Sequence, residues 1–213
     1  MIKRLFFLVA FCGLSLSLSA QLAPTFGLRA GLGLSTYTAN AEGISISFGN
    51  TTKVYVRAFY INPIGGGSSL QLEGGYSGRG LEVDFGDIFG GGGGSTASSI
   101  NFDVLELGLL YRYDINSLAP AHVYFLAGHV IGYAFNGVRK EGGVTSDVDF
   151  NVEGLNRTDV SLEIGGGLAF GPGGRISAEA RIGFGLSQLN SDTPDDEGTL
   201  KHRVIQIGLG YSF

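Results

Sequence analysis

Cysteine, tryptophan and charged residues are scarce in this chain of 213 residues. It contains one cysteine, no tryptophan and five prolines, and only 15% of its side chains are charged. The cysteine, Cys12, lies in an N-terminal apolar run that we expect to be removed, so disulfides and a thiol nucleophile are excluded from the rest of the chain. Phe11 precedes it where a lipidation signal requires a small residue, which argues against a lipid anchor.

Long apolar runs and basic residues are also lacking beyond the N-terminus. A membrane-spanning helix needs roughly 20 apolar residues, and neither such a stretch nor a helix-period pattern follows the N-terminal run. Without Lys3 and Arg4, 12 basic side chains face 19 acidic ones, and the net charge of −7 argues against a nucleic-acid partner. In a membrane, such a chain could only form a closed barrel.

The first 20 residues have the features of a secretory signal peptide. Lys3 and Arg4 precede an apolar run, Leu5–Leu18, and the small residues Ser19 and Ala20 follow it. The alternative, a single transmembrane helix, would need a longer run. We expect cleavage after Ala20 or, as a second choice, after Ser19. Residues 21–213 then form one domain, which their number fits.

Apolar residues alternate with small or polar ones along most of this domain, and a period of two predicts β-strands. The C-terminal segment Arg203–Phe213 shows the pattern most clearly, with two aromatic residues at the end of its apolar face. Eight strands are expected, at Thr25–Tyr37, Lys53–Ile61, Ser69–Leu81, Ile100–Tyr113, Ala121–Phe135, Thr158–Phe170, Arg175–Leu189 and Leu200–Phe213.

The connections between these strands alternate in length. Residues 38–52, 82–99, 136–157 and 190–199 form long connections, whereas 62–68, 114–120 and 171–174 form short ones with proline or glycine turn signals. An even strand count with this alternation is typical of transmembrane barrels. The predicted fold is all-β, an eight-stranded antiparallel up-and-down transmembrane barrel. We expect the turns and both termini to be periplasmic and the long loops extracellular.

Glycine indicates which face of the strands lines the barrel. A soluble, lipocalin-like barrel would turn its apolar face inward, whereas a membrane barrel turns that face to lipid. Most strand glycines, such as Gly31, Gly167 and Gly208, share the polar face. Glycine weakens a solvated strand but suits a narrow lumen where side chains would collide. We therefore predict a polar lumen. An aromatic girdle is expected at the periplasmic border, formed by Phe26, Tyr60, Tyr111, Tyr113, Phe170, Tyr211 and Phe213.

Charged residues recur on the predicted inner face at similar heights, in the periplasmic half. They are Arg29, Arg57, Glu73, Glu106, Glu163, Glu179 and Arg181. Since an unpaired buried charge costs several kcal/mol, these side chains should pair in the lumen. The favoured interpretation is a structural salt-bridge plug, because a small barrel has room for side chains but not for an open channel. The alternative is a gated path for protons or ions.

Three histidines are the candidates for catalysis. His122 follows a periplasmic turn and is expected at the interface, His202 has inward parity near the outer rim, and His129 has lipid-facing parity. His129 therefore either marks a bulge or faces the membrane as a site for chemistry. An enzyme acting on lipid A or peptides needs a histidine beside a serine or an acid. The sequence shows no such pair, so no catalytic residue is predicted.

The long loops are acidic, and their carboxylates have two interpretations. Representative residues are Glu82, Asp147 and Asp192. One is a divalent-cation site, but the spacing fits no calcium-loop pattern. Solvated loop charge is the favoured interpretation, and neither a metal nor a cofactor is predicted.

Four segments resemble the PorT-type outer-membrane β-barrel family of Gram-negative bacteria. They are LQLEGGYSGRG (70–80), VLELGLLYRY (104–113), YFLAGHVIGY (124–133) and VIQIGLGYSF (204–213). The chain departs from the family pattern at Gly74 and Leu107, where proline is common. The resemblance implies an eight-stranded barrel that the assembly machinery inserts through its last strand. The corresponding assembly signal here is Ile207, Leu209, Tyr211 and Phe213.

Together these features predict a small integral outer-membrane barrel with a closed lumen, acting structurally or through extracellular loops in binding or adhesion. The alternatives are an outer-membrane enzyme and a narrow gated channel. Expected partners are outer-membrane lipid, lipopolysaccharide and the barrel-assembly machinery, and the expected state is a monomer. The sequence does not identify a ligand for the loops.

Overall fold

The computed structural model describes residues 24–41, 44–47, 49, 51–84, 97–115, 121–150, 152, 155–171, 174–187 and 199–213. The predicted signal peptide, residues 1–20, and the glycine run Gly90–Gly94 lie outside these ranges. Across the described ranges, no helix is long and apolar enough to cross a membrane.

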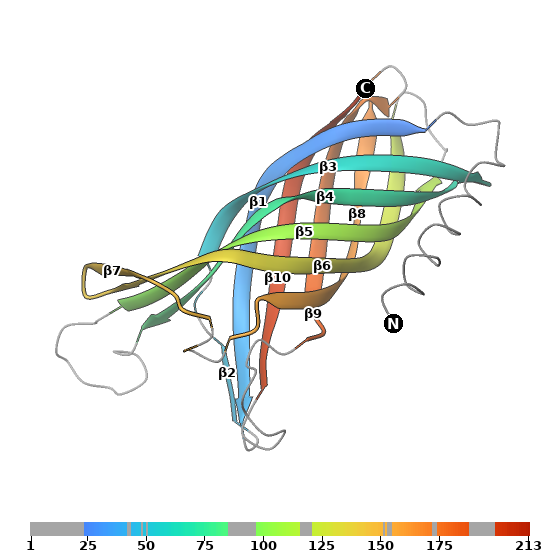
Figure 1. The fold of residues 1–213 in the computed structure, drawn as a ribbon. Helices are drawn as coiled ribbons and strands as arrows, with labels where there is room; N and C mark the ends of the chain where they lie inside the picture. The colour runs from blue at the N-terminus through green and yellow to red at the C-terminus, as the bar shows by residue number, and fades with distance from the viewer. Residues whose placement is uncertain are drawn as a thin grey trace, which may run out of the picture.

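Ten β-strands form the described chain (Figure 1). They are β1 (Thr25–Ala41), β2 (Ile44–Ser47), β3 (Thr51–Gly65), β4 (Ser68–Asp84), β5 (Ala97–Ile115), β6 (Ala121–Glu141), β7 (Val144–Asp147), β8 (Thr158–Phe170), β9 (Ile176–Gly185) and β10 (Thr199–Ser212). All of them except β2 and β7 follow one another around a closed antiparallel barrel, in which β10 pairs back onto β1. The predicted eight-stranded up-and-down barrel is confirmed.

Most barrel strands run further than alternation alone predicted, but β9 ends at Gly185 and not at the predicted Leu189. The backbone N–H groups of Leu186 and Ser187 both donate to the Val160 carbonyl, which ends the regular strand pairing there.

β6 continues beyond Phe135 to Glu141, and a turn through Gly142 and Gly143 then leads into β7, which pairs with β6. Phe135 itself is an inserted residue, because Asp103 pairs with Asn136 while Val104 pairs with Ala134. The bulge reverses the parity of the following residues. Backbone pairing therefore continues after the apolar pattern has ended.

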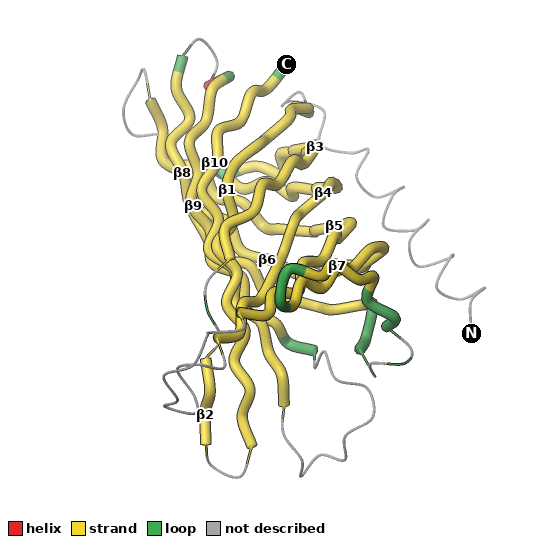
Figure 2. Tube along the Cα trace, turned by 90° about the vertical axis from the view of Figure 1, so that its left-hand side faces the viewer, coloured by secondary structure: helices red, strands yellow, loops and turns green. Residues whose placement is uncertain are grey.

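The two ends of the barrel differ in their connections. The turn end carries the tight β3–β4 turn at Gly66 and Gly67, the β5–β6 and β8–β9 connections, and the C-terminal Phe213. The loop end carries the short strands β2 and β7. In Figure 1 the C-terminus lies at the top and β2 at the bottom, and Figure 2 shows the same separation from the side.

The two faces of the barrel wall have opposite character. Outward side chains such as Leu107 and Ile207 are 58% and 65% exposed, whereas inward polar residues such as Arg57 and Gln71 are almost completely buried. Several inward glycines are required by this packing, as at Gly167, where a Cβ would lie 2.5 Å from the Tyr124 hydroxyl. The apolar face therefore points outward and the glycine-rich polar face lines the lumen.

Candidate functional site: the charged lumen

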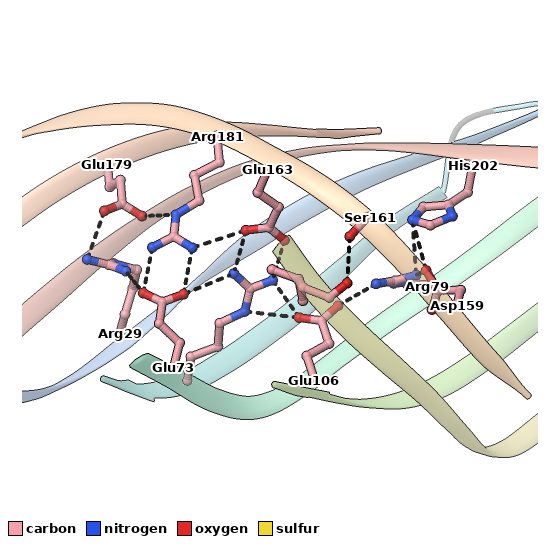
Figure 3. A network of polar contacts seen from close by, with 12 residues as sticks. Arg29, Glu73, Arg79, Glu106, Asp159, Ser161, Glu163, Glu179, Arg181 and His202 are labelled. Carbon is pink, nitrogen blue, oxygen red and sulfur yellow. Dashed lines mark hydrogen bonds and ion pairs between the residues drawn. The ribbon is translucent and has the colours of Figure 1, made fainter. Parts of the chain in front are cut away.

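A continuous set of ion pairs fills the lumen, and we call it the lumen network (Figure 3). Its members are Arg29, Arg57, Glu73, Arg79, Glu106, Asp159, Glu163, Glu179, Arg181 and His202. They project from β1, β3, β4, β5, β8, β9 and β10. Every member is less than one-tenth exposed. The alternating signs compensate the cost of burying so many charges in a narrow space.

The part of the network nearer the turn end centres on Glu73. Its carboxylate accepts two hydrogen bonds of 2.6 Å from Arg181 Nη1 and Nη2, and a third of 2.8 Å from Arg29 Nη1. Arg29 Nη2 lies 2.8 Å from Glu179 Oε2, which also accepts a hydrogen bond of 2.8 Å from the Tyr124 hydroxyl. Such paired contacts fix the geometry of both side chains.

Arg57 joins the two halves of the network. Its Nη1 and Nη2 donate to the two oxygens of Glu163 at 3.1 and 3.0 Å, and its Nε donates to Glu106 Oε2 at 3.0 Å. Beyond Glu106, Arg79 Nη2 lies 2.7 Å from Glu106 Oε1, and Arg79 Nη1 lies 3.0 Å from Asp159 Oδ2. The chain of contacts therefore runs along the lumen without a break.

His202 and Asp159 end the network toward the loop end. His202 Nε2 lies 3.1 Å from Arg79 Nη1 and 3.4 Å from Asp159 Oδ2. His202 has the inward parity near the rim that the sequence predicted. Four guanidinium groups in the network face five carboxylates, and His202 lies beside one of these carboxylates, Asp159, which also pairs with Arg79.

The fold brings together all seven charged residues predicted from the sequence, and it adds three more. Arg79, Asp159 and His202 were missing from the predicted cluster. Strand parity could have found them, because Arg79 shares the inward parity of Glu73 and Asp159 that of Glu163. Their height relative to the others depends on the stagger between strands, which the sequence pattern does not give.

Apolar side chains close the lumen at the loop end. This mouth cluster consists of Tyr37, Leu81, Phe102, Val104, Ala134, Val148 and Phe150. Val148 and Phe150 come from the segment after β7, and Phe150 stacks against Phe102 with ring centres 5.9 Å apart. The backbone of Val148 donates to the Gly137 carbonyl at 2.9 Å. Part of a predicted long loop thus folds back over the lumen network.

A cavity of about 180 Å³ occupies the lumen at the turn end. Arg112, Asp114, His122 and Ser177 contribute polar groups to its lining. Arg112 donates to both Asp114 oxygens, at 2.9 and 2.6 Å, and its guanidinium lies 3.7 Å from the centre of the Tyr124 ring. His122 Nε2 lies 3.7 Å from Asp114 Oδ1, a proximity that the sequence did not predict. His122 thus faces the lumen at the turn end.

His129 lies on the outer face of the barrel. It pairs with Leu109 on β5 and Leu162 on β8 in regular register, and its side chain is exposed. The bulge in β6 is at Phe135, six residues further along. Of the two interpretations offered for His129, the membrane-facing position is therefore the one observed.

Aromatic residues border the apolar face at both ends. At the turn end, Phe26 stacks on Tyr60 with centres 4.8 Å apart, and Tyr211 meets Phe213 edge-on at 5.5 Å. At the loop end, Tyr76 packs against Phe135 at 6.5 Å. The backbone N–H of Phe213 donates to the Phe26 carbonyl at 2.8 Å. The four residues of the predicted assembly signal all lie on the outer face of β10 or directly after it.

Acidic residues form no metal centre in the described part of the chain, where no group of three or more His, Cys, Asp or Glu side chains could hold an ion. Asp147 and Asp149 are exposed on the loop end. Glu82, predicted in a long loop, lies in β4 and is exposed, and Asp192 lies outside the described ranges.

Comparisons with known proteins agree with this geometry. The family model of the outer membrane protein beta-barrel domain matches residues 19–191. A comparison with curated protein sequences gives no match.

Three solved structures are similar to this chain at low sequence identity. Ail, the attachment invasion locus protein of Yersinia pestis, is 17% identical, with 90% of this chain and 100% of that chain covered and a TM-score of 0.45. Neisserial surface protein A is 12% identical, with 90% and 100% covered and a TM-score of 0.48. OprG from Pseudomonas aeruginosa is 12% identical, with 90% and 96% covered and a TM-score of 0.47.

The match to the family model extends over most of the chain, and it coincides with a closed barrel that has an apolar outer wall and a charged lumen. The chain belongs to the outer membrane protein beta-barrel domain family and is an integral protein of the outer membrane.

Proposed function

We propose that this protein is a closed outer-membrane barrel that acts structurally or through its extracellular surface, in binding or adhesion. The observation that carries the proposal is the lumen network, whose buried ion pairs cross the interior and argue against an open pore. The strand pair β6–β7 continues beyond the barrel at the loop end, where the side chains of Glu141–Asp147 are exposed (Figure 1). A strand pair of this kind is a suitable carrier for binding residues.

Replacing residues 137–147 by an Asn-Gly turn tests this proposal. Cells that display the full barrel should adhere to plates coated with fibronectin, collagen or mucin more strongly than cells that display the shortened variant. Heat-modifiable gel mobility checks that both barrels are folded. Equal adhesion of both cell lines on every coating would remove the β6–β7 pair from the proposal and leave the structural role.

A narrow gated channel is the second candidate, and one observation favours it. The lumen network is continuous, its loop end meets a small cavity lined by Arg79 and Asp159, and its turn end lies next to the 180 Å³ cavity. In planar bilayers the native barrel should be silent, and Glu106→Gln or Arg29→Gln should raise conductance if the network is a gate. A barrel that is silent in all three forms excludes the channel.

We propose no catalytic role for the described histidines. The Asp114–His122 pair is shared with Arg112, and His129 faces outward between leucines. The test is the mass spectrum of lipid A from cells that express the native protein or His129→Ala. A mass change that depends on His129 would establish the enzyme instead.

The orientation and biogenesis are part of the same proposal. The turn end would be periplasmic and the loop end extracellular, as in barrels with short turns on one side. Residues 1–20 would be cleaved on export. The barrel-assembly machinery would then insert the barrel as a monomer. The resemblance of segments 70–80, 104–113, 124–133 and 204–213 supports membership of a PorT-type subgroup. Protease cleavage of a tag inserted at Gly143 in intact cells tests the orientation. N-terminal sequencing of the purified protein tests the cleavage of residues 1–20.

A further inference from the structure

Two exposed basic residues lie where the apolar outer wall ends at the loop end. On the outer face of β10, Leu209, Ile207 and Ile205 are followed by Arg203 and then Lys201. The three aliphatic side chains are 66%, 65% and 47% exposed, as expected for residues that contact lipid. Both basic side chains are exposed too. The two positive charges therefore lie next to the hydrocarbon-facing surface, on its loop-end side.

The neighbouring strands hold Arg203 against the barrel wall. On β9, Phe184 pairs with Arg203, and the guanidinium carbon lies 5.2 Å from the centre of the Phe184 ring. On β1, Thr36 and Thr38 pair with Arg203 and Lys201. A guanidinium that lies over an aromatic ring keeps the N–H groups at its edge available for hydrogen bonds. This arrangement suits bidentate binding of a phosphate.

The other side of the barrel has a different chemistry at this border. Asp103 is the first polar residue beyond Leu105 on the outer face of β5, and it accepts hydrogen bonds from Tyr76 at 2.6 Å and Asn136 at 2.9 Å. That side therefore presents an acid with hydrogen-bond partners. Among the described residues, adjacent exposed cations at the border are confined to β10.

We propose that Lys201 and Arg203 bind a phosphate group of lipid A in the outer leaflet. Lipid A carries phosphates on a sugar backbone directly above its acyl chains, so a phosphate would lie at the height of the two cations while the chains cover Ile205, Ile207 and Leu209. Arg203 supplies a bidentate contact to the phosphate, and Lys201 supplies a second positive charge. The assignment rests on the proposed orientation, in which the loop end is extracellular.

Native mass spectrometry of the full barrel in zwitterionic detergent measures this binding. Bisphosphorylated lipid A, the same lipid A without phosphates, and phosphatidylglycerol are titrated in parallel. The double variant Lys201→Gln/Arg203→Gln should bind bisphosphorylated lipid A about 25-fold more weakly, since each basic residue near an anionic lipid contributes roughly fivefold. The matched control Lys140→Gln/Arg175→Gln removes two exposed cations elsewhere on the barrel. Its affinity for bisphosphorylated lipid A should stay within about twofold of that of the native protein.

Three outcomes would overturn the proposal: unchanged affinity of the double variant, equal binding of lipid A without phosphates, or equal binding of phosphatidylglycerol. Arg203→Lys, which keeps the charge but not the planar fork, serves as a second variant and should weaken binding by less than the double change. The purified protein is tested without cells, so failure here leaves the adhesion assay of the β6–β7 pair unaffected.

Discussion

Arg181 and Glu73 face each other across the lumen and are joined by two parallel contacts, Nη1–Oε2 and Nη2–Oε1, both 2.6 Å long. They come from β9 and β4, which are not neighbours in the barrel. Both side chains are 2% exposed. The pair therefore ties opposite walls together, and its energetics differ from those of a surface salt bridge because water cannot replace a lost partner.

Glu73→Gln should destabilise the barrel strongly. The change leaves Arg181, Arg29 and Arg57 in the lumen with one carboxylate fewer, and breaking a buried pair on one side costs about 3–5 kcal/mol. Urea titration of the barrel in lipid vesicles, followed by the gel shift of the folded form, measures the loss. Glu141→Gln, on the exposed end of β6, is the control and should change stability by less than about 0.5 kcal/mol. Equal stability of both variants would contradict a paired lumen.

Removing both partners should be milder than removing one. Arg181→Met combined with Glu73→Leu takes away two charges of opposite sign, and replacing a buried ion pair by apolar groups is often neutral or better. The double variant should therefore be at least about 1 kcal/mol more stable than the less stable single variant. Additive losses in the same urea titration would argue against direct coupling of these two residues.

The effect of a glycine-to-alanine substitution on stability should depend on whether the glycine faces the lumen or the outside of the barrel. A Cβ on Gly167 would lie 2.5 Å from the Tyr124 hydroxyl, whereas a Cβ on Gly74 would lie 3.8 Å from its nearest neighbours. Gly167→Ala should cost about 1–3 kcal/mol through overpacking. Gly74→Ala should gain up to about 1 kcal/mol, because glycine weakens a strand interior. Vesicle refolding yields and urea midpoints of the two variants check the expectation, and the reverse order would contradict the assigned faces.

His129→Leu should stabilise the barrel without changing lipid A. His129 is an exposed polar residue between Leu109 and Leu162 on the outer wall. Charged residues on the lipid face cost about 2–4 kcal/mol at mid-depth, and we expect a smaller cost, about 1 kcal/mol, for the imidazole of His129. Urea midpoints in vesicles measure the gain. A loss of stability would mean that His129 has a partner in the membrane.

Phe213→Ala should impair assembly in cells more than stability in vitro. Phe213 closes the last strand through its contact with Tyr211 and the hydrogen bond of its backbone N–H to Phe26, and the substitution keeps that backbone bond. After refolding into vesicles, the free energy of unfolding of the variant should stay within about 1 kcal/mol of that of the native protein. The folded fraction in outer membranes, read from heat-modifiable mobility, should fall severalfold, whereas Phe170→Ala at the same border should not lower it. Equal yields for both variants would remove the assembly role.

Tertiary structure determined the heights of the charges and the closure of the mouth. Arg79 has the parity of Glu73 in the sequence, but only the stagger of β4 against β5 and β8 brings it to Glu106 and Asp159. Phe150 lies in a predicted long loop and has no strand pattern, yet it packs on Phe102 in the lumen mouth. Neither contact can be read from a local period, because both depend on registers set across the whole closed sheet.

The sequence by itself determined the eight strands of the barrel wall, the alternation of long and short connections, and the face that points to lipid, but not the short strands β2 and β7. It could do so because side chains alternate along a strand, and because a chain without long apolar helices can satisfy its backbone in a membrane only as a closed barrel. Which charges meet was decided by the closed structure. Partners such as Arg181 and Glu73 come from opposite walls, so their contact arises only when β10 pairs with β1 and the lumen excludes water.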